Sequence, residues 1–182
     1  MSDVDSRLLE VIRQRSFRRG HFRLSSGAES NFYFNLKPTM MSPEGAHLAA
    51  RALLARIWEE NVDYVGGLEM GAVPVIACIA ALSHADGKPV KTFFVRKQTK
   101  DHGTQDLVEG LATGESLSGK RVMIVDDVAT SGGSILKTAE TARAAGATVE
   151  SALVIVDREE GAHEALQKAG IRLKSVLRAS DF

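Results

Sequence analysis

The residues best suited to chemistry follow a short apolar run in the second half of the chain. Residues 122–125 read Val-Met-Ile-Val, and two adjacent carboxylates, Asp126 and Asp127, come directly after them. Small, hydroxyl-bearing and glycine residues follow: Val128, Ala129, Thr130, Ser131, Gly132, Gly133 and Ser134. Glycines let successive backbone N–H groups point at one anion, hydroxyls add donors, and a helix start adds partial positive charge. The segment predicts a phosphate-binding loop beside two carboxylates.

Other phosphate motifs do not match this segment. It lacks the lysine of a Walker loop and the glycine spacing of a dinucleotide-binding fingerprint. The two carboxylates stand too close to the loop to bind phosphate themselves, so we expect Asp126 and Asp127 to bind sugar hydroxyls. They could also seat a Mg²⁺ ion, directly or through water. The alternative is an acidic turn before a capped helix, with no ligand at all.

A second candidate segment, residues 96–103, is rich in cations. Four side chains that can carry positive charge fall within seven positions: Arg96, Lys97, Lys100 and His102. The segment is too polar for a core, and long loops in small domains are often lids. A lysine and a histidine over a pyrophosphate would neutralise a leaving group as its charge grows. Because acidic residues follow at positions 106 and 109, a solvated loop of mixed charge is the alternative.

Two further segments follow predicted strands. The glycines of residues 66–74 either aim backbone donors at an anion or pack a strand closely against a helix, and both explanations stay open. We expect Glu69, in this segment, to be a solvated residue on the rim. Arg158 could bind a planar ligand with a carboxylate through its guanidinium fork. An ion pair with Asp157 or Glu160 is the alternative for that arginine.

Strand and helix patterns alternate from Tyr64 onward. Short apolar or β-branched runs predict strands at residues 64–68, 90–95, 122–125, 149–156 and 171–176. Helical patterns separate them, near residues 72–82, 133–145 and 162–169. Strands that are apolar throughout are buried on both faces, so we predict an α/β fold with a mainly parallel central sheet flanked by helices. Ligands bind at the carboxyl ends of such strands, where all four candidate segments stand.

The first 40 residues follow a different pattern. A helix over residues 3–16 is broken by Gly20, and two short strands at 22–24 and 32–34 flank a turn. Ser42 and Pro43 then begin a helix that is predicted to run to about residue 61. We treat residues 1–182 as one domain, with a small N-terminal part, mainly 1–40, on a core of residues 41–182.

Composition limits the partners of the chain. Its 182 residues include 23 Lys and Arg and 23 Asp and Glu, so the net charge is zero. This balance excludes nonspecific nucleic-acid binding, which needs many basic groups. A single cysteine, Cys78, permits no intrachain disulfide, and the uncharged run 71–82 is too short to span a bilayer. With no pattern of a signal peptide, we expect a cytoplasmic protein with neither membrane nor nucleic-acid partners.

Taken in order along about residues 5–178, these segments resemble the type I phosphoribosyltransferase family. In that family the acidic pair contacts the ribose hydroxyls of phosphoribosyl pyrophosphate (PRPP), and the following loop holds its 5-phosphate. The resemblance implies four catalytic residues: Lys100, His102, Asp126 and Asp127. It implies a larger set of PRPP-binding residues: Arg96, Lys97, Lys100, His102, Asp126, Asp127, Val128, Ala129, Thr130, Ser131, Gly132, Gly133 and Ser134.

The closest resemblance is to the members of that family that use orotate. Residues 22–37 are similar to their hood, the segment that encloses the pyrimidine, and we use this name for the N-terminal part. The resemblance implies orotate contacts at Phe32, Tyr33, Thr130 and Arg158. Many members have a lysine where this chain has Ser25; Lys37 is a cation nearby in sequence.

The resemblance also implies a reaction and an assembly. Orotate and PRPP would give orotidine 5′-monophosphate and pyrophosphate, with Mg²⁺ as cofactor, in pyrimidine biosynthesis. Residues 96–109 would reach the active site of the neighbouring subunit in a homodimer. Two alternatives keep the fold: transfer to a purine base, and a PRPP-sensing regulator that binds nucleic acid. The hood and Arg158 count against the first, and zero net charge counts against the second.

Overall fold

The computed structural model describes residues 1–23, 29–98 and 107–182. Its elements are α1 (Asp3–Arg15), β1 (Phe17–Arg23), β2 (Glu29–Phe34), α2 (Lys37–Met40), α3 (Pro43–Ile57), β3 (Tyr64–Leu68), α4 (Ala72–Ala85), β4 (Lys91–Val95), β5 (Val108–Glu109), β6 (Arg121–Ala129), α5 (Gly133–Ala144), β7 (Thr148–Asp157), α6 (Ala162–Lys168), β8 (Arg172–Arg178) and a 3₁₀ turn (Ala179–Asp181). Lys100, His102 and Ser25, all named from the sequence, lie outside the described residues.

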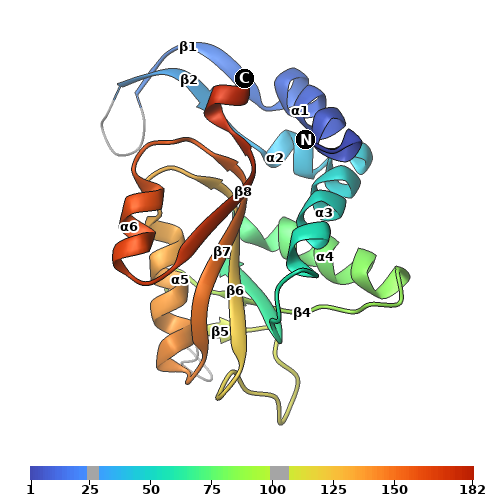
Figure 1. The fold of residues 1–182 in the computed structure, drawn as a ribbon, viewed down its shortest axis with the longest axis vertical. Coiled ribbons are helices and arrows are strands. Elements are labelled where there is room, and N and C mark those ends of the chain that lie inside the picture. The colour runs from blue at the N-terminus through green and yellow to red at the C-terminus, as the bar shows by residue number, and fades with distance from the viewer. Residues whose placement is uncertain (24–28, 99–106) are drawn as a thin grey trace.

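The described strands of the core form one sheet in the order β5-β4-β3-β6-β7-β8. Neighbouring strands from β4 to β8 run parallel, which confirms the predicted α/β class, and β5 is an antiparallel edge strand that the sequence did not predict. Because β4, β3, β6 and β7 lie side by side, the segments that follow them meet at one edge of the sheet (Figure 1).

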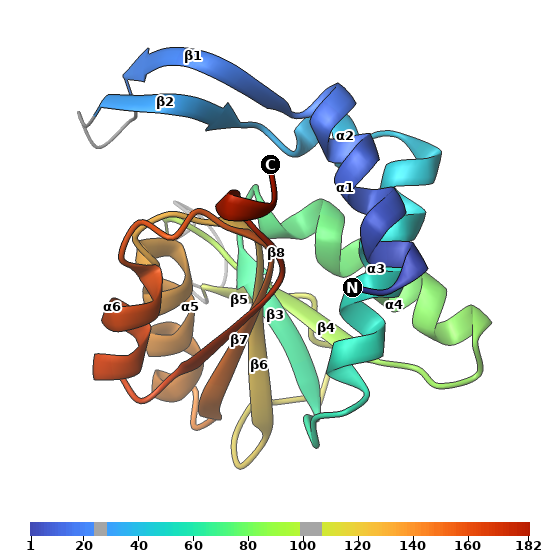
Figure 2. The ribbon, with the colours of Figure 1, turned by 45° about the horizontal axis from the view of Figure 1, so that its top comes forward.

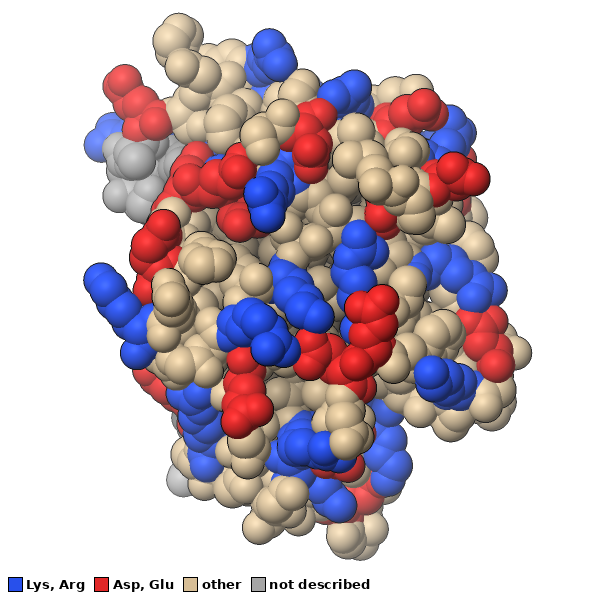
Figure 3. All heavy atoms as spheres, in the orientation of Figure 1, with Lys and Arg blue, Asp and Glu red and all other residues tan. Residues whose placement is uncertain are grey.

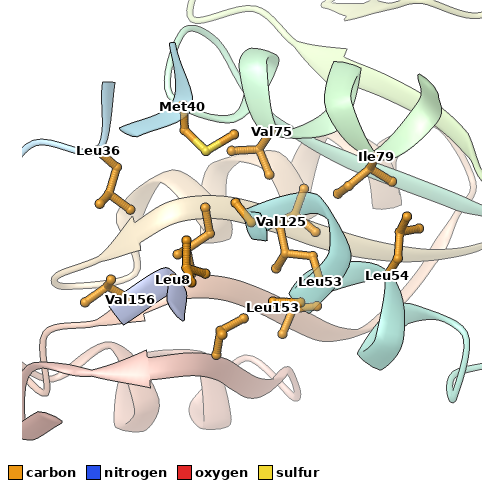
Figure 4. Packing of buried hydrophobic residues seen from close by; sticks show 14 of the residues in the cluster. Leu8, Leu36, Met40, Leu53, Leu54, Val75, Ile79, Val125, Leu153 and Val156 are labelled. Carbon is orange, nitrogen blue, oxygen red and sulfur yellow. The ribbon is translucent and has the colours of Figure 1, made fainter. Parts of the chain in front are cut away.

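Helices cover both faces of this sheet. Helices α1, α3 and α4 bury one apolar cluster against the sheet, and α5 and α6 bury a second cluster on the opposite face. Figure 4 shows Leu53 of α3 and Val75 of α4 beside Val125 of β6 in the first cluster. Each large aliphatic side chain buried in this way stabilises the fold by about 1.5–3 kcal/mol. The two clusters therefore hold the strands in fixed register beneath the functional edge.

Within the hood, strands β1 and β2 form an antiparallel hairpin above the carboxyl ends of the sheet strands (Figure 2). Phe182 packs beneath it, with its ring centre 5.1 Å from that of Phe17 and 4.9 Å from that of Phe34. Phe32 joins the same cluster, 5.7 Å from Phe34. Aromatic pairs at these separations contribute about 0.5–1.5 kcal/mol each beyond burial. The C-terminal segment thus helps to fix the hood over the core.

Several predicted boundaries are wrong. The helix predicted over residues 3–16 is α1, which ends at Arg15, but Gly20 lies inside β1, which begins at Phe17 and not at the predicted residue 22. Helix α3 ends at Ile57, short of the predicted residue 61, and Glu60, expected in the helix, pairs with Arg172 and Lys174 of β8. Strand β6 continues past residue 125 to Ala129, because its last residues still pair with β7.

Charges of both signs are interspersed on the face in Figure 3, without a large patch of one sign. This distribution agrees with a net charge of zero and gives that face no broad surface for a polyanion. Within the described ranges, no helix has the length and apolar character needed to cross a bilayer.

Candidate active site

Asp126 and Asp127 occupy consecutive positions near the end of β6, beside Gly71. A Cβ atom added at Gly71 would lie 3.2 Å from the Oδ1 atoms of both carboxylates. Each carboxylate also accepts the N–H of the next residue, at 3.0 Å for Asp126 and 2.8 Å for Asp127. The absence of a side chain at Gly71 therefore leaves space against both acidic groups.

The surroundings of the acidic pair oppose two negative charges. Burial, followed by the negative charge of Asp127, raises the pKa of Asp126 to about 8. Burial also raises the pKa of Asp127. Two lysines act in the opposite direction: the charge of Lys97 favours ionised Asp126 and that of Lys37 favours ionised Asp127. A bound cation or several hydroxyl donors would stabilise the doubly ionised pair.

The predicted phosphate loop surrounds a small cavity of about 270 Å³. Its lining residues run from the acidic pair into α5: Asp126, Val128, Ala129, Thr130, Ser131, Gly132, Gly133, Ser134 and Ile135. Gly132 adopts the left-handed conformation, with φ of 82°, and α5 begins at the next residue. Since the first turn of a helix has backbone N–H groups without intrahelical partners, this cavity suits a phosphate.

The glycines of residues 66–74 have two different roles: some allow close packing of the core, and one leaves space at the acidic pair. A Cβ atom at Gly66 would lie 2.2 Å from the Phe93 ring, and one at Gly67 would lie 2.2 Å from Ala72 Cβ. Close packing therefore explains these two glycines, which lie inside β3. Only Gly71 in this segment faces the acidic pair.

Glu69 is only partly the solvated rim residue that we expected. It is half-buried, and its Oε1 accepts the Lys97 N–H at 2.7 Å. The Lys97 carbonyl in turn accepts a hydrogen bond from Lys137 Nζ at 2.8 Å. Lys137 was not identified from the sequence, because nothing in the helical pattern of α5 indicates that this exposed residue contacts Lys97.

Residues 96–98 and 107–109, the described residues on either side of 99–106, are joined at Arg96. Its backbone N–H donates to the Leu107 carbonyl at 2.9 Å, and its guanidinium lies 3.7 Å from a carboxylate oxygen of Glu109. Residues 96–98 and 107–109 therefore both lie on the side of the sheet that carries the acidic pair. The pairing with Glu109 shows that part of the mixed-charge alternative is present.

Arg158 lies at the boundary between the core and the hood. Its side chain is only 4% exposed, and Nη2 donates to Ser30 Oγ at 3.1 Å and to Glu160 Oε1 at 2.8 Å. The guanidinium carbon lies 4.9 Å from the Phe32 ring centre. Within the described part of the chain, Nε is buried without a hydrogen-bond partner. The ion pair with Glu160 exists, while Asp157 accepts the Glu159 N–H instead.

Arg158 also lines a larger cavity of about 840 Å³. The lining residues come from both the hood and the core: Arg23, Glu29, Tyr33, Phe34, Asn35, Leu36, Lys37, Asp127, Val128, Thr130, Ser131, Arg158 and Glu160. Tyr33 faces this space, whereas the Phe32 ring packs against Arg158. Lys37 and Asp127 both line this cavity, and the charge of Lys37 acts on Asp127, so Lys37 reaches the site.

No cluster of three or more His, Cys, Asp and Glu side chains suited to a metal ion occurs in residues 1–23, 29–98 and 107–182. The acidic pair offers carboxylate oxygens, the ligands that Mg²⁺ prefers. Any such ion would need further oxygen ligands from a substrate or from water.

Comparisons with known proteins agree on one family. The phosphoribosyl transferase domain family matches residues 42–174. An orotate phosphoribosyltransferase of Rhodopseudomonas palustris (strain BisB18) is 54% identical over 177 residues, which cover 97% of this chain and 95% of that protein. A second relative of the same name, from Aquifex aeolicus, is 39% identical over 97% of this chain and 96% of its own.

Solved structures give the same result. The orotate phosphoribosyltransferase of Mycobacterium tuberculosis H37Rv, in complex with Fe(III) dicitrate, superimposes with a TM-score of 0.83 at 35% identity and covers 98% of both chains. The PRPP complex of the M. tuberculosis enzyme gives a TM-score of 0.80 at 32% identity, again over 98% of both chains.

Proposed function

The chain belongs to the orotate phosphoribosyltransferase family, and from this premise we propose how its own residues perform the reaction. The protein is a pentosyltransferase that moves the 5-phosphoribosyl group of PRPP to orotate in pyrimidine biosynthesis. The products are orotidine 5′-monophosphate and pyrophosphate.

The observation that carries the proposal is the junction of the two cavities. Val128, Thr130 and Ser131 line both the small cavity around the phosphate loop and the larger cavity beneath the hood. Asp126 lines the first and Asp127 the second. A ligand with a phosphate, a sugar and a planar base fits this order, with the sugar hydroxyls beside the acidic pair.

We assign each side chain by the group that it can bind. The loop from Ala129 to Ser134 holds the 5-phosphate, and Asp126 and Asp127 bind the ribose hydroxyls. Orotate lies in the larger cavity, with contacts from Thr130, Arg158, Tyr33 and the Phe32 region. Arg96 and Lys97 bind the pyrophosphate side of PRPP, and by resemblance Lys100 and His102 complete that set.

The reaction is a substitution at the anomeric carbon of ribose. The bond from that carbon to a pyrophosphate oxygen breaks, and its electron pair leaves with pyrophosphate. Orotate N1 supplies the pair for the new bond and releases its proton to the solvent. The carbon passes through a cationic, oxocarbenium-like state, so the protein needs no covalent intermediate. Its residues hold phosphate, sugar and base in line and exclude water. Each cationic contact to the leaving group lowers the barrier by about 2–4 kcal/mol.

The acidic pair fits the Mg²⁺ cofactor. Both carboxylates face the space beside Gly71. Burial raises the pKa of each, and the charge of Asp127 raises the pKa of Asp126 further, so a cation would offset both effects. Asp126 or Asp127 would hold the ion directly or through water, with PRPP oxygens as the other ligands. When bound, Mg²⁺ neutralises charge on pyrophosphate as it leaves.

We further propose a cytoplasmic homodimer in which residues 96–109 serve the neighbouring active site. The single cysteine is half-buried and unpaired, which suits a reducing compartment. The dimer rests on the resemblance. Light scattering of the purified protein gives the oligomeric state directly, and a monomer at assay concentration would overturn this part.

The function is tested by following orotate absorbance with purified protein, PRPP and Mg²⁺. Adenine and hypoxanthine are the comparison acceptors, and Mg²⁺-free protein in a chelator is the cofactor control. We expect orotate to be consumed and the purines to remain. Turnover of a purine alone, or PRPP binding without turnover of any base, would overturn the proposal in favour of a purine enzyme or a PRPP sensor.

A further inference from the structure

We propose that Glu69 and Lys137 are positioning residues that together fix the backbone of Lys97 on both sides of its Cα and so aim its side chain at the PRPP site. Glu69 Oε1 accepts the Lys97 N–H at 2.7 Å, and Lys137 Nζ donates to the Lys97 carbonyl at 2.8 Å. The inference rests on the proposed function, because it assumes that Lys97 acts on bound PRPP.

Three separate elements converge on this residue. Lys97 follows β4, Glu69 follows β3, and Lys137 lies one turn into α5, the helix that begins at the phosphate loop. The Glu69 backbone N–H also donates to the Val95 carbonyl at 2.9 Å, which extends the β3–β4 pairing up to the contact. The N–H and the carbonyl of Lys97 are thus each held by a charged side chain. Lys137 comes from the helix that begins at the phosphate loop, and Glu69 comes from the segment that contains Gly71.

The two contacts limit how freely Lys97 can move. Lys97 is exposed, and a long lysine side chain on a free loop would sample many positions. Fixing its backbone from both sides limits those positions and keeps the ammonium on the side of Asp126. Small displacements of such groups in an active site change rates by about 100-fold.

The same contacts contribute little to folding. Lys137 is exposed and Glu69 is half-buried, and neither belongs to an apolar cluster of the core. Polar contacts with this much solvent around them add little to stability. We therefore expect variants of the two residues to fold, so that a loss of activity in them reports on positioning and not on structural support.

The test compares Glu69→Ala and Lys137→Met with the conservative variants Glu69→Gln and Lys137→Arg. Gln keeps an oxygen acceptor and Arg keeps an N–H donor. Glu140→Ala, on the exposed face of α5, and Lys168→Met, on α6, are the matched controls. Each protein is assayed for kcat, the KM of PRPP and the KM of orotate, and its Tm is recorded.

We expect Glu69→Ala and Lys137→Met each to lower kcat/KM for PRPP at least about tenfold, with the KM of orotate within about twofold and Tm within a few degrees. Gln and Arg should restore most of the loss. The double variant Glu69→Ala/Lys137→Met should lose less than the product of the single losses, because both contacts hold the same residue, Lys97.

Three results would overturn the inference: wild-type rates in the single variants, equal rises in the KM of PRPP and the KM of orotate, or no rescue by Gln and Arg. Failure of the proposed function is a separate result, since the wild-type protein itself would then not convert orotate. In that case calorimetric PRPP affinities of the same variants still decide the positioning role, with weaker binding expected for Glu69→Ala and Lys137→Met alone.

Discussion

The guanidinium of Arg158 lies 4.9 Å from the ring centre of Phe32, so a residue that follows a core strand and a residue of the hood share one contact. Ser30, on the same hood strand, accepts a hydrogen bond from the Arg158 side chain. Movement of the hood and orientation of Arg158 are therefore coupled. A substitution of Arg158 therefore acts through the loss of its charge or through the loss of its planar contact with Phe32. A substitution that keeps the charge separates the two effects.

Replacing Arg158 by Lys should raise the KM of orotate about 10- to 100-fold. Lysine keeps the charge but loses the planar fork and the contact with Phe32, and hydrogen bonds to charged groups contribute about 1.5–3 kcal/mol each. Steady-state kinetics at saturating PRPP measure the change, with Arg172→Lys on β8 as the control. A lower Tm with an unchanged KM would mean that Arg158 serves only its ion pair with Glu160.

Replacing Glu160 by Gln should lower the KM of orotate about two- to fivefold. The Glu160 carboxylate lies 2.8 Å from Arg158 Nη2 and competes with the carboxylate of the substrate for the same guanidinium. A partly exposed pair of this kind contributes about 0–1 kcal/mol, which sets the size of the effect. The change should shrink as salt is added. A rise in KM as large as that in Arg158→Lys would show that Glu160 holds the arginine in place instead.

Asp126→Asn should remove a pH dependence of stability from the metal-free protein without substrate. The ordinary pKa of the side chain is 3.8, and burial with the charge of Asp127 raises it to about 8 in the folded protein. Between these values the folded state holds a proton that the unfolded state has released. The free energy of unfolding therefore falls as pH rises from about 4 to 8.

Thermal unfolding from pH 5 to 8 in the presence of a chelator measures this effect. The variant should gain Tm relative to wild type as the pH rises, while its activity is lost. Curves that stay parallel across the range would mean that Asp126 does not titrate there.

Gly67→Ala should destabilise the protein by about 1–3 kcal/mol, the usual cost of overpacking a core. The added methyl would lie 2.2 Å from Ala72 Cβ and 2.5 Å from the Val125 carbonyl oxygen. For a chain of this size each kcal/mol lowers Tm by about 2–4 °C. A wild-type Tm in Gly67→Ala would contradict the role of crowding.

Much of the core could be predicted from local pattern. Strand β3 matches its predicted boundaries, because an apolar run between polar residues marks both ends. The meeting of four segments at one edge also follows from parallel strands, whose carboxyl ends share that edge. The end of β6 could not be predicted in this way. Asp126 reads as a loop residue by type, but its backbone pairs with Val154 of β7.

Contacts between distant segments were beyond the sequence pattern. The contact of Glu69 with Lys97 spans 28 residues and that of Lys137 with Lys97 spans 40. Both depend on which strands are neighbours, and hydrophobic periodicity predicts elements without their order in the sheet. The position of Ser30 against Arg158 depends in the same way on where the hood lies over the core.

Lys100→Ala should lower kcat about 100- to 1000-fold and change PRPP affinity far less. In the proposed reaction its ammonium acts on charge that grows only as the pyrophosphate leaves, so its loss affects the transition state more than the bound substrate. Single-turnover rates together with calorimetric PRPP affinity separate the two effects. An unchanged kcat would remove Lys100 from the mechanism.

Mixing two inactive variants decides which subunit Lys100 serves. Lys100→Ala and Asp126→Asn are unfolded together in equal amounts and refolded, so that about half of the dimers are hybrids. If residues 96–109 act on the neighbouring site, each hybrid has one site with both defects and one with none, and the mixture recovers about a quarter of wild-type activity. If Lys100 acts within its own subunit, every site has one defect and no activity returns. Refolded wild-type protein, treated alike, provides the reference rate.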